Sequence, residues 1–224
     1  MTATFRSATG ANITADGTNI SAPTPSGTVA GDFLFCWVTG NGHNITAFDA
    51  DYPQIGARQD GGAFPADMTC FGGVNTGTMP VYSIDVAGTP NANIGVIAVQ
   101  RSGAGTLALD TGTGAPAQSI DGSSSTSHVS DSVTPNQDNS CICVAFGGYA
   151  TGGMTGTTAT FTERRDAEYW GHSYGASLDQ TTAAAAACTM TSSANEATCK
   201  TIVVIYEAAA AATTRMLASL GVGN

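Results

Sequence analysis

Three histidines have the widest chemical repertoire in this sequence, because imidazole can bind metals or move protons near neutral pH. They are His43, His128 and His172. None has the spacing of a zinc-binding pair such as HExxH or HxH, and each falls in a stretch expected to be a loop or a polar strand. We therefore expect solvated histidines that bind no metal.

Serine and threonine are abundant, and a serine nucleophile needs an activating base beside it. We identify no SxxK motif and no GxSxG nucleophile elbow. One sequence does not rule out a Ser/His/Asp triad assembled from distant residues, but no spacing supports one. We expect no enzymatic activity.

Six cysteines could suggest disulfides, but the sequence shows no basic start followed by an apolar segment, so we expect a reducing environment. Cys36, Cys141 and Cys143 lie inside apolar runs, where a free thiol packs as a small hydrophobe. Cys188 and Cys199 flank a short hairpin-like segment and are the pair that a bridge would join, if one exists.

Two groups of charged residues could bind a cation or form ion pairs. Asp49, Asp51 and Asp60 are loop carboxylates that could contact calcium, but their spacing does not match an EF-hand, so we expect no metal and no cofactor. The run ERRD at 163–166 is expected to be a solvated cluster of mutually neutralising charges.

Aromatic side chains gather in the second half of the chain, at Tyr149, Tyr169, Trp170 and Tyr174. Exposed aromatics on a β-sandwich stack on sugar rings or anchor protein interfaces. Alternation along a strand would instead place Trp170 and Tyr174 in the core, and we favour that interpretation while keeping glycan contact as the alternative.

Composition indicates a folded, acidic protein. Of 224 residues 42% are hydrophobic, enough for an ordinary core, and only 11% are charged. Seven Lys and Arg against 17 Asp and Glu give a net charge of −10, which opposes approach to phosphate backbones. No apolar run is long enough to span a membrane. We expect no direct nucleic-acid partner, no membrane partner and no classical secretion.

The apolar segments that would position these residues come in matched pairs. GTVAGDFLFCWVTG (27–40) and PNQDNSCICVAFGG (135–148) each lead from a polar turn into an unbroken apolar run that ends at glycine. Asp32 and Asn139 occupy the same place, 107 residues apart, and IGVIAV (94–99) and TIVVIY (201–206) keep that offset. The sequence therefore predicts one motif used twice.

Shorter segments bounded by glycine predict the remaining strands. The alanine run 183–187 is assigned to a strand in preference to a helix, and 207–220 is the other helix candidate. Strands are expected at 4–8, 33–38, 45–48, 68–74, 81–86, 94–99, 127–133, 141–146, 157–162, 168–178 and 201–206.

This pattern predicts an all-β antiparallel β-sandwich or jelly roll built from two tandem repeats with a short C-terminal tail. Residues 1–103 form the first repeat, 104–126 an exposed Gly/Ser/Thr-rich joint, 127–207 the second repeat and 208–224 the tail. Apolar runs that do not alternate need cover on both faces. Either the halves wrap around each other, or a subunit interface hides the outer faces.

The arrangement resembles a family of tandem-repeat β-sandwich proteins of tailed bacteriophages and bacterial surface proteins. The resemblance rests on a Ser/Thr/Pro lead, GxxxGD, glycine-ended apolar strands and a Gly/Ser/Thr joint before a second copy. Where the family usually has Pro-x-Gly-Trp after the first strand, this chain has AFDADYPQI. The segments that carry the resemblance, across residues 1–208, are GTVAGDFLFCWVTG, MTCFGGV, IGVIAVQRSGAG, NSCICVAFGG, EYWGHSYGAS and TIVVIYEAA, and RMLASLGVGN resembles the tails of phage structural proteins.

The resemblance implies a virion structural protein, first of all a decoration or cement protein on the capsid surface, assembled in the host cytoplasm. It implies a homo-oligomer, with a trimer as first guess, and the major capsid protein or other virion proteins as partners. Residues 2–7 or 207–224 are expected to act as an arm on the shell. The alternative is a receptor- or glycan-binding domain of a head or tail fibre. Interface residues are expected in the tail, at Met216, Leu217, Leu220 and Val222.

Overall fold

The computed structural model describes residues 1–14, 17–40, 43–60, 67–86, 92–112, 114–148, 153–156, 158–168 and 172–210. Within these residues every strand pairing is antiparallel and no helix is present, so none is available to cross a membrane. The predicted all-β fold class is confirmed.

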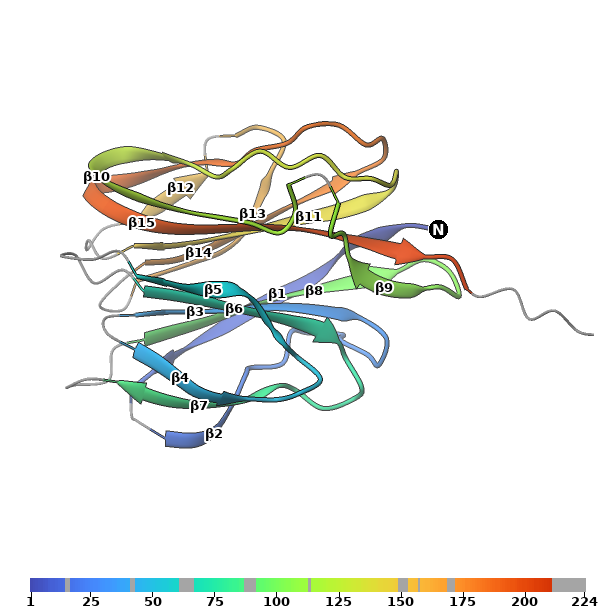
Figure 1. Ribbon diagram of the computed structural model, residues 1–224, viewed down its shortest axis with the longest axis horizontal. Helices are drawn as coiled ribbons and strands as arrows, with labels where there is room; N and C mark the ends of the chain where they lie inside the picture. The colour runs from blue at the N-terminus through green and yellow to red at the C-terminus, as the bar shows by residue number, and fades with distance from the viewer. Residues whose placement is uncertain are drawn as a thin grey trace, which may run out of the picture.

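Strands from the first half of the chain form two sheets, which lie one above the other (Figure 1). The larger sheet has the order β1-β8-β3-β6-β5, and the smaller has the order β2-β7-β4. The strand bounds are β1 Ala3–Ile13, β2 Gly17–Ser21, β3 Phe33–Gly40, β4 His43–Phe48, β5 Gln54–Asp60, β6 Asp67–Val74, β7 Val81–Val86 and β8 Ala92–Arg101.

The second half follows the same order within one sheet, β10-β15-β11-β14-β13. The 20-residue strand β15 pairs with β11 and the start of β10 through its later residues, and its last residues pair with β9. Its first residues pair with β12 on one side and the end of β10 on the other, so β10-β15-β12 matches β2-β7-β4. The bounds are β9 Thr106–Leu109, β10 Ala117–Val129, β11 Ser140–Gly148, β12 Met154–Gly156, β13 Thr162–Glu168, β14 His172–Gln180 and β15 Thr189–Ala208.

The central strands of the two larger sheets also agree in register. Leu34 in β3 pairs with Ala98 in β8, and the residues 107 positions later, Cys141 and Ile205, pair in β11 and β15. The offset found in the sequence therefore links strands that are paired with each other in each half. It does not preserve the faces, because Leu34 and Ala98 lie in an outer apolar layer whereas Cys141 and Ile205 lie in the central one.

Three apolar layers account for the unbroken apolar runs. In β3, alternate side chains point to opposite faces: Phe33, Phe35 and Trp37 join a central layer between the two halves, and Leu34 joins an outer layer under β2, β4 and β7. In β11, Cys143 faces the central layer while its neighbours face the start of β15 and β12. The halves therefore pack face to face, and each outer face is covered by its own half.

Trp37 lies where the two halves pack closely against each other. A Cβ atom on Gly95 would lie 2.1 Å from the Trp37 ring, and one on Gly175, in the opposite sheet, would lie 2.5 Å from it. The indole Nε1 donates a hydrogen bond of 2.9 Å to Ser173 Oγ. Glycines on both sides of the ring let the sheets come this close.

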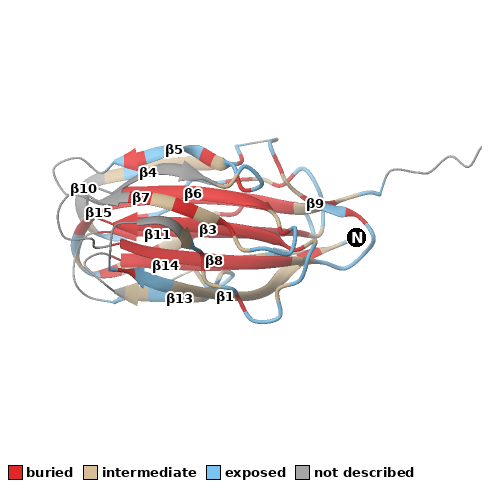
Figure 2. Ribbon diagram, turned by 90° about the horizontal axis from the view of Figure 1, so that it is seen from below, coloured by how far each residue is buried: buried red, intermediate tan, exposed pale blue. Residues whose placement is uncertain are grey.

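The edge strands close both sides of the sandwich. Along one side, the Arg164 guanidinium of β13 lies 3.5 Å from the centre of the Phe5 ring of β1. Along the other, Gln59 Nε2 of β5 donates to Ser119 O of β10 at 2.6 Å, and Thr201 Oγ1 donates to Gln59 Oε1 at 2.9 Å. Figure 2 shows the buried strands in the middle, with the partly exposed β1, β5 and β13 at the margins.

Several sequence predictions are wrong in detail. The joint at 104–126 contains β9 and much of β10, both paired with β15. The alanine run 183–187 forms no strand apart from an isolated bridge between Ala186 and Val133, and 158–160 is a turn outside β13. Residues 2–7 form no free arm. Residues 3–7 belong to β1, which pairs with β8, the Ala3 amide donates to Asn139 O of the second half, and Thr2 N donates to Glu207.

Candidate functional site

Two histidines are fully buried, which corrects the expectation that they are solvated. His128 in β10 and His172 in β14 both have no exposed surface. The side chain of His43 lies outside the described residues. A buried imidazole must find polar partners inside the protein, and both histidines face carboxylates.

His128 stands between a carboxylate and a hydroxyl. Its Nδ1 lies 3.3 Å from Asp121 Oδ2, and its Nε2 lies 3.1 Å from Ser192 Oγ. Ser192 is almost fully buried, and the side chain of Asp121 is one-fifth exposed. The order Asp–His–Ser is the order of groups that activates a serine nucleophile in hydrolases.

The serine hydroxyl has two acceptors and one proton. Ser192 Oγ lies 2.7 Å from Ala194 O as well as 3.1 Å from His128 Nε2. When the hydroxyl donates to Ala194 O, His128 Nε2 must carry a proton to complete its bond to the serine oxygen. When the hydroxyl rotates toward His128, a neutral imidazole accepts its proton and keeps Nδ1–H for Asp121.

The hydrogen-bonded series Asp121–His128–Ser192 lies at an irregularity in the pairing of β10 and β15, where β15 passes from one layer to the next. Thr191 pairs with Ser127 and Glu196 pairs with Ser125, so residues 192–195 of β15 face only one residue of β10. Such a bulge bends a strand and re-aims its side chains. Ser192 lies at its start, next to the exposed Ser193.

A second buried pair lies near the end of the same bulge. His172 Nδ1 is 3.4 Å from Glu196 Oε1, and both side chains are about 1% exposed. A Cβ atom on Gly148 would lie 2.2 Å from Glu196 Oε2, so the glycine at the end of β11 makes room for this carboxylate. Within the described residues, no three His, Cys, Asp or Glu side chains are grouped to hold a metal ion.

One serine motif was missed by the sequence reasoning. The pentapeptide GHSYG at 171–175 has the GxSxG pattern. Ser173 lies near the start of β14, is fully buried, and accepts the hydrogen bond from Trp37. Since no helix follows, this serine is not at a nucleophile elbow. No sequence motif pointed to Ser192 or Asp121. Ser192 is distant from His128 in the sequence, and the irregular pairing of β10 and β15 brings both residues to it.

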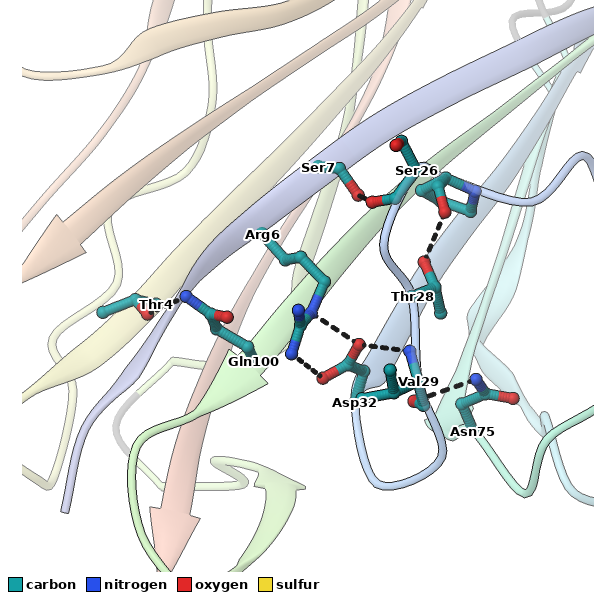
Figure 3. Close-up of polar contacts among 10 residues, drawn as sticks. Thr4, Arg6, Ser7, Ser26, Thr28, Val29, Asp32, Asn75 and Gln100 are labelled. Atoms are coloured by element: carbon teal, nitrogen blue, oxygen red, sulfur yellow. Dashed lines mark hydrogen bonds and ion pairs between the residues drawn. The ribbon is translucent and has the colours of Figure 1, made fainter.

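The aspartate of the GxxxGD motif organises a turn (Figure 3). Asp32 is 2% exposed and forms a two-point ion pair with Arg6, at 2.7 Å to Nε and 3.1 Å to Nη2. Its Oδ2 also accepts from Val29 N at 2.9 Å, and its carbonyl accepts from Asn75 N at 2.7 Å. Asp32 therefore joins β1, the turn before β3 and the end of β6, which is a structural role.

Glu207 fixes the opposite end of the sandwich. Its carboxylate accepts backbone hydrogen bonds from Thr2 at 3.0 Å, Ser102 at 3.1 Å, Gly103 at 3.1 Å and Gly105 at 2.9 Å. Burial alone would raise the pKa of Glu207, but these amide donors outweigh it and lower the pKa. One side chain thus ties the N-terminus, the β8–β9 connection and the end of β15 together.

All six cysteines are buried and free. The predicted packing role of Cys36, Cys141 and Cys143 is confirmed, and Cys141 and Cys143 lie on one face of β11 with their sulfurs 3.8 Å apart. Cys188 and Cys199 are unbridged, since they belong to different apolar layers. Burial raises the pKa of Cys36 to about 12.

The charged run 163–166 is not a simple solvated cluster. Arg164 covers Phe5 and donates from Nε to Ser177 Oγ at 2.8 Å, while the Arg165 guanidinium fills the space above Gly10. Burial lowers the pKa of Arg165. Both arginines therefore contact β1 from β13, Arg164 at Phe5 and Arg165 at Gly10.

Most residues predicted to contact a glycan or a partner lie outside the described residues. They are Tyr149, Tyr169, Trp170 and the tail residues Met216, Leu217, Leu220 and Val222. Tyr174 is described and is buried, with its ring in edge-to-face contact with Phe146. It is a core residue and not a glycan contact.

Comparison of the chain with protein-family models, curated proteins and solved structures gives no match.

Proposed function

We propose that this chain is a structural protein of a tailed-phage virion, acting as a decoration or cement protein on the capsid. The proposal rests on the resemblance of its sequence motifs, and one structural observation carries it further. The described residues form stacked sheets that cover their own apolar faces, and the last strand ends at Ala208, next to Glu207 and its hydrogen bonds.

We also propose that the two halves are copies of one unit. The equal strand orders of the larger sheets support this. A duplicated unit that packs on itself places two similar outer layers on opposite sides of one molecule. That arrangement suits a protein that stiffens a shell while keeping its own shape.

The attachment element in this proposal is the tail, 208–224. It carries Arg215 among small and apolar residues, while residues 1–208 hold the other six basic residues and all 17 acidic ones. Glu207 fixes the point where the tail begins. The partner is a shell protein, and the trimer is a proposal from the resemblance alone, because the apolar strand faces that suggested an interface are covered within the chain.

Removal of the tail tests this role. A chain ending at residue 208 is expected to keep its melting temperature and to lose co-sedimentation with purified capsids. A full-length control with Thr213 and Thr214 replaced by serine should still bind. Unchanged attachment of the shortened chain would exclude the tail as the arm, and binding by neither form would exclude the capsid as the partner.

A glycan-binding role is the second candidate, favoured by one observation at the end of the sheet. Gly148, His172 and Glu168 lie in one row of paired residues, where β11, β14 and β13 meet. Tyr149 follows this row directly and Tyr169 and Trp170 lie between two of its members in sequence. Loss of glycan-array binding in Trp170→Ala, with an unchanged melting temperature, would favour this role over cement.

A further inference from the structure

We propose that Ser192 is the nucleophile of a site that hydrolyses small, uncharged acyl esters, with His128 as its general base and Asp121 as a positioning residue. This activity is separate from the virion role and stands or falls independently of it. The proposal starts from the hydrogen-bonded series Asp121–His128–Ser192, whose members come from β10 and β15.

The heavy atoms already have the spacing that proton transfer requires. Ser192 Oγ lies 3.1 Å from His128 Nε2, within the range for a general base and the hydroxyl it deprotonates. Rotation about the Cβ–Oγ bond moves the hydroxyl proton from Ala194 O to His128 without moving the backbone. Asp121, 3.3 Å from Nδ1, selects the tautomer that leaves Nε2 free to accept.

The position of the series limits what can reach it. Ser192 is 3% exposed, but it begins a bulge whose next residue, Ser193, and whose residue Asn195 are exposed. Solvent also reaches the other end of the series, at Asp121. Access to Ser192 Oγ therefore requires movement of the bulge, which favours a short acyl chain, and the net charge of −10 disfavours an anionic ester.

The outer layer of the second half contains the buried polar groups of Ser192 and His128, which stabilise the fold less than the apolar side chains at the equivalent place in the first half. In the first half, β7 contributes Tyr82 and Ile84 to the apolar layer. In the second half, the start of β15 contributes Met190 to the apolar layer, followed by Ser192, which contacts His128. Well-packed apolar side chains are often more stabilising than a buried charged or polar group. A buried polar series at a position where apolar side chains would be more stabilising is therefore a candidate for function.

The reaction balances with water as the only co-reactant. Ser192 Oγ attacks the ester carbonyl carbon while its proton passes to His128 Nε2. The C–O bond to the alcohol then breaks, and His128 protonates the departing alcohol to leave an acyl-serine. Water attacks the acyl carbon, gives a proton to His128, and the acid departs as Ser192 recovers its proton.

The first test is covalent labelling of the full-length protein with a small alkyl fluorophosphonate. The serine oxygen replaces fluoride on phosphorus, and the proton leaves with fluoride. We expect one adduct per chain, mapped to Ser192 by peptide mass spectrometry, and turnover of p-nitrophenyl acetate. Absence of an adduct at Ser192, with no ester turnover above buffer, would overturn the proposal and leave Ser192 as a residue that holds the bulge.

Matched variants separate catalysis from structure. Ser192→Ala should lose labelling and turnover, while Ser193→Ala, at the exposed neighbour, should keep both. His128→Gln should slow labelling by roughly a hundredfold. Equal labelling in wild type, Ser192→Ala and His128→Gln would contradict the proposal, whatever their melting temperatures.

Asp121 is tested through the conservative replacement. Asp121→Asn should slow labelling by on the order of a hundredfold or more, because it no longer fixes the tautomer of His128. Asp121→Glu should restore part of the rate, and Asp131→Asn, at an exposed aspartate of the following loop, should not change it. A rate in Asp121→Asn equal to wild type would remove Asp121 from the site.

Discussion

At the scale of single residues, buried carboxylates join segments that are distant in the sequence. Glu207 accepts hydrogen bonds from four backbone amides in two separate stretches, and Asp32 joins Arg6 to the turn before β3. In both cases, fixed hydrogen-bond donors of the protein take the place of the water that would solvate the carboxylate, and a buried charge is tolerated under this condition.

Glu207 gives a prediction for the dependence of stability on pH. Because its pKa is lowered in the folded protein, its contribution is present above its ordinary value of 4.5 and is lost as pH falls through the folded pKa. Glu207→Gln should reduce the free energy of unfolding at pH 7 by about 2 kcal/mol. Urea unfolding at several pH values should show this difference shrinking below pH 4.5.

The matched control is Glu163→Gln, at an exposed position of β13. It should leave the stability at pH 7 nearly unchanged. A difference between Glu207→Gln and wild type that stayed constant down to pH 2.5 would contradict the role of the ionised carboxylate.

The thiols give a second prediction at this scale. Burial raises the pKa of Cys36, Cys70, Cys188 and Cys199 to about 12, so these groups are both protonated and enclosed at neutral pH. Iodoacetamide should therefore modify none of the six cysteines in the native protein and all six in guanidinium chloride, as counted by intact mass. Rapid native labelling of Cys36 or Cys143 would show that their strands are not packed on both faces.

At the scale of elements, close contact between β3, β8 and β14 depends on glycine. Gly175→Ala would bring a Cβ atom to 2.5 Å from the Trp37 ring, so a sheet or the indole must shift. We expect a loss of about 1–3 kcal/mol in the free energy of unfolding. Trp37→Phe in the same chain should recover part of this loss, and strictly additive effects in the double-mutant cycle would contradict direct contact.

The strands show what the sequence could predict and what it could not. Runs such as 33–38, 94–99 and 141–146 are apolar over their whole length, as expected of strands covered on both faces, and the structure confirms strands there. The Gly/Ser/Thr-rich segment 104–126 has no such signal. It becomes strand only because β15 offers a free edge, which is a tertiary effect that composition does not encode.

The candidate site was less predictable than the fold. The spacing of Asp121 and His128, seven residues apart, would place them on opposite faces of a regular strand. Register shifts between β10 and β15 bring them together, and Ser192 arrives from a strand 64 residues away. In contrast, the sequence correctly predicted that both faces of the unbroken apolar strands are covered. The central layer between the halves covers one of these faces.

At the scale of the whole molecule, the halves share one central layer and should not unfold separately. That layer contains Trp37 and Phe35 from the first half and Cys143 and Val203 from the second. Equilibrium unfolding followed by far-UV circular dichroism and by tryptophan fluorescence should therefore give one coincident transition. Two separated transitions would show that the halves are independent domains.

The proposed virion role is tested most directly by the abundance of this chain in purified phage particles. Quantitative mass spectrometry with isotope-labelled peptides measures its copy number relative to the major capsid protein. A cement protein that covers the shell should be present in a number comparable with that protein. A few copies per particle, or none, would contradict the account, the former pointing to a fibre and the latter removing the chain from the virion.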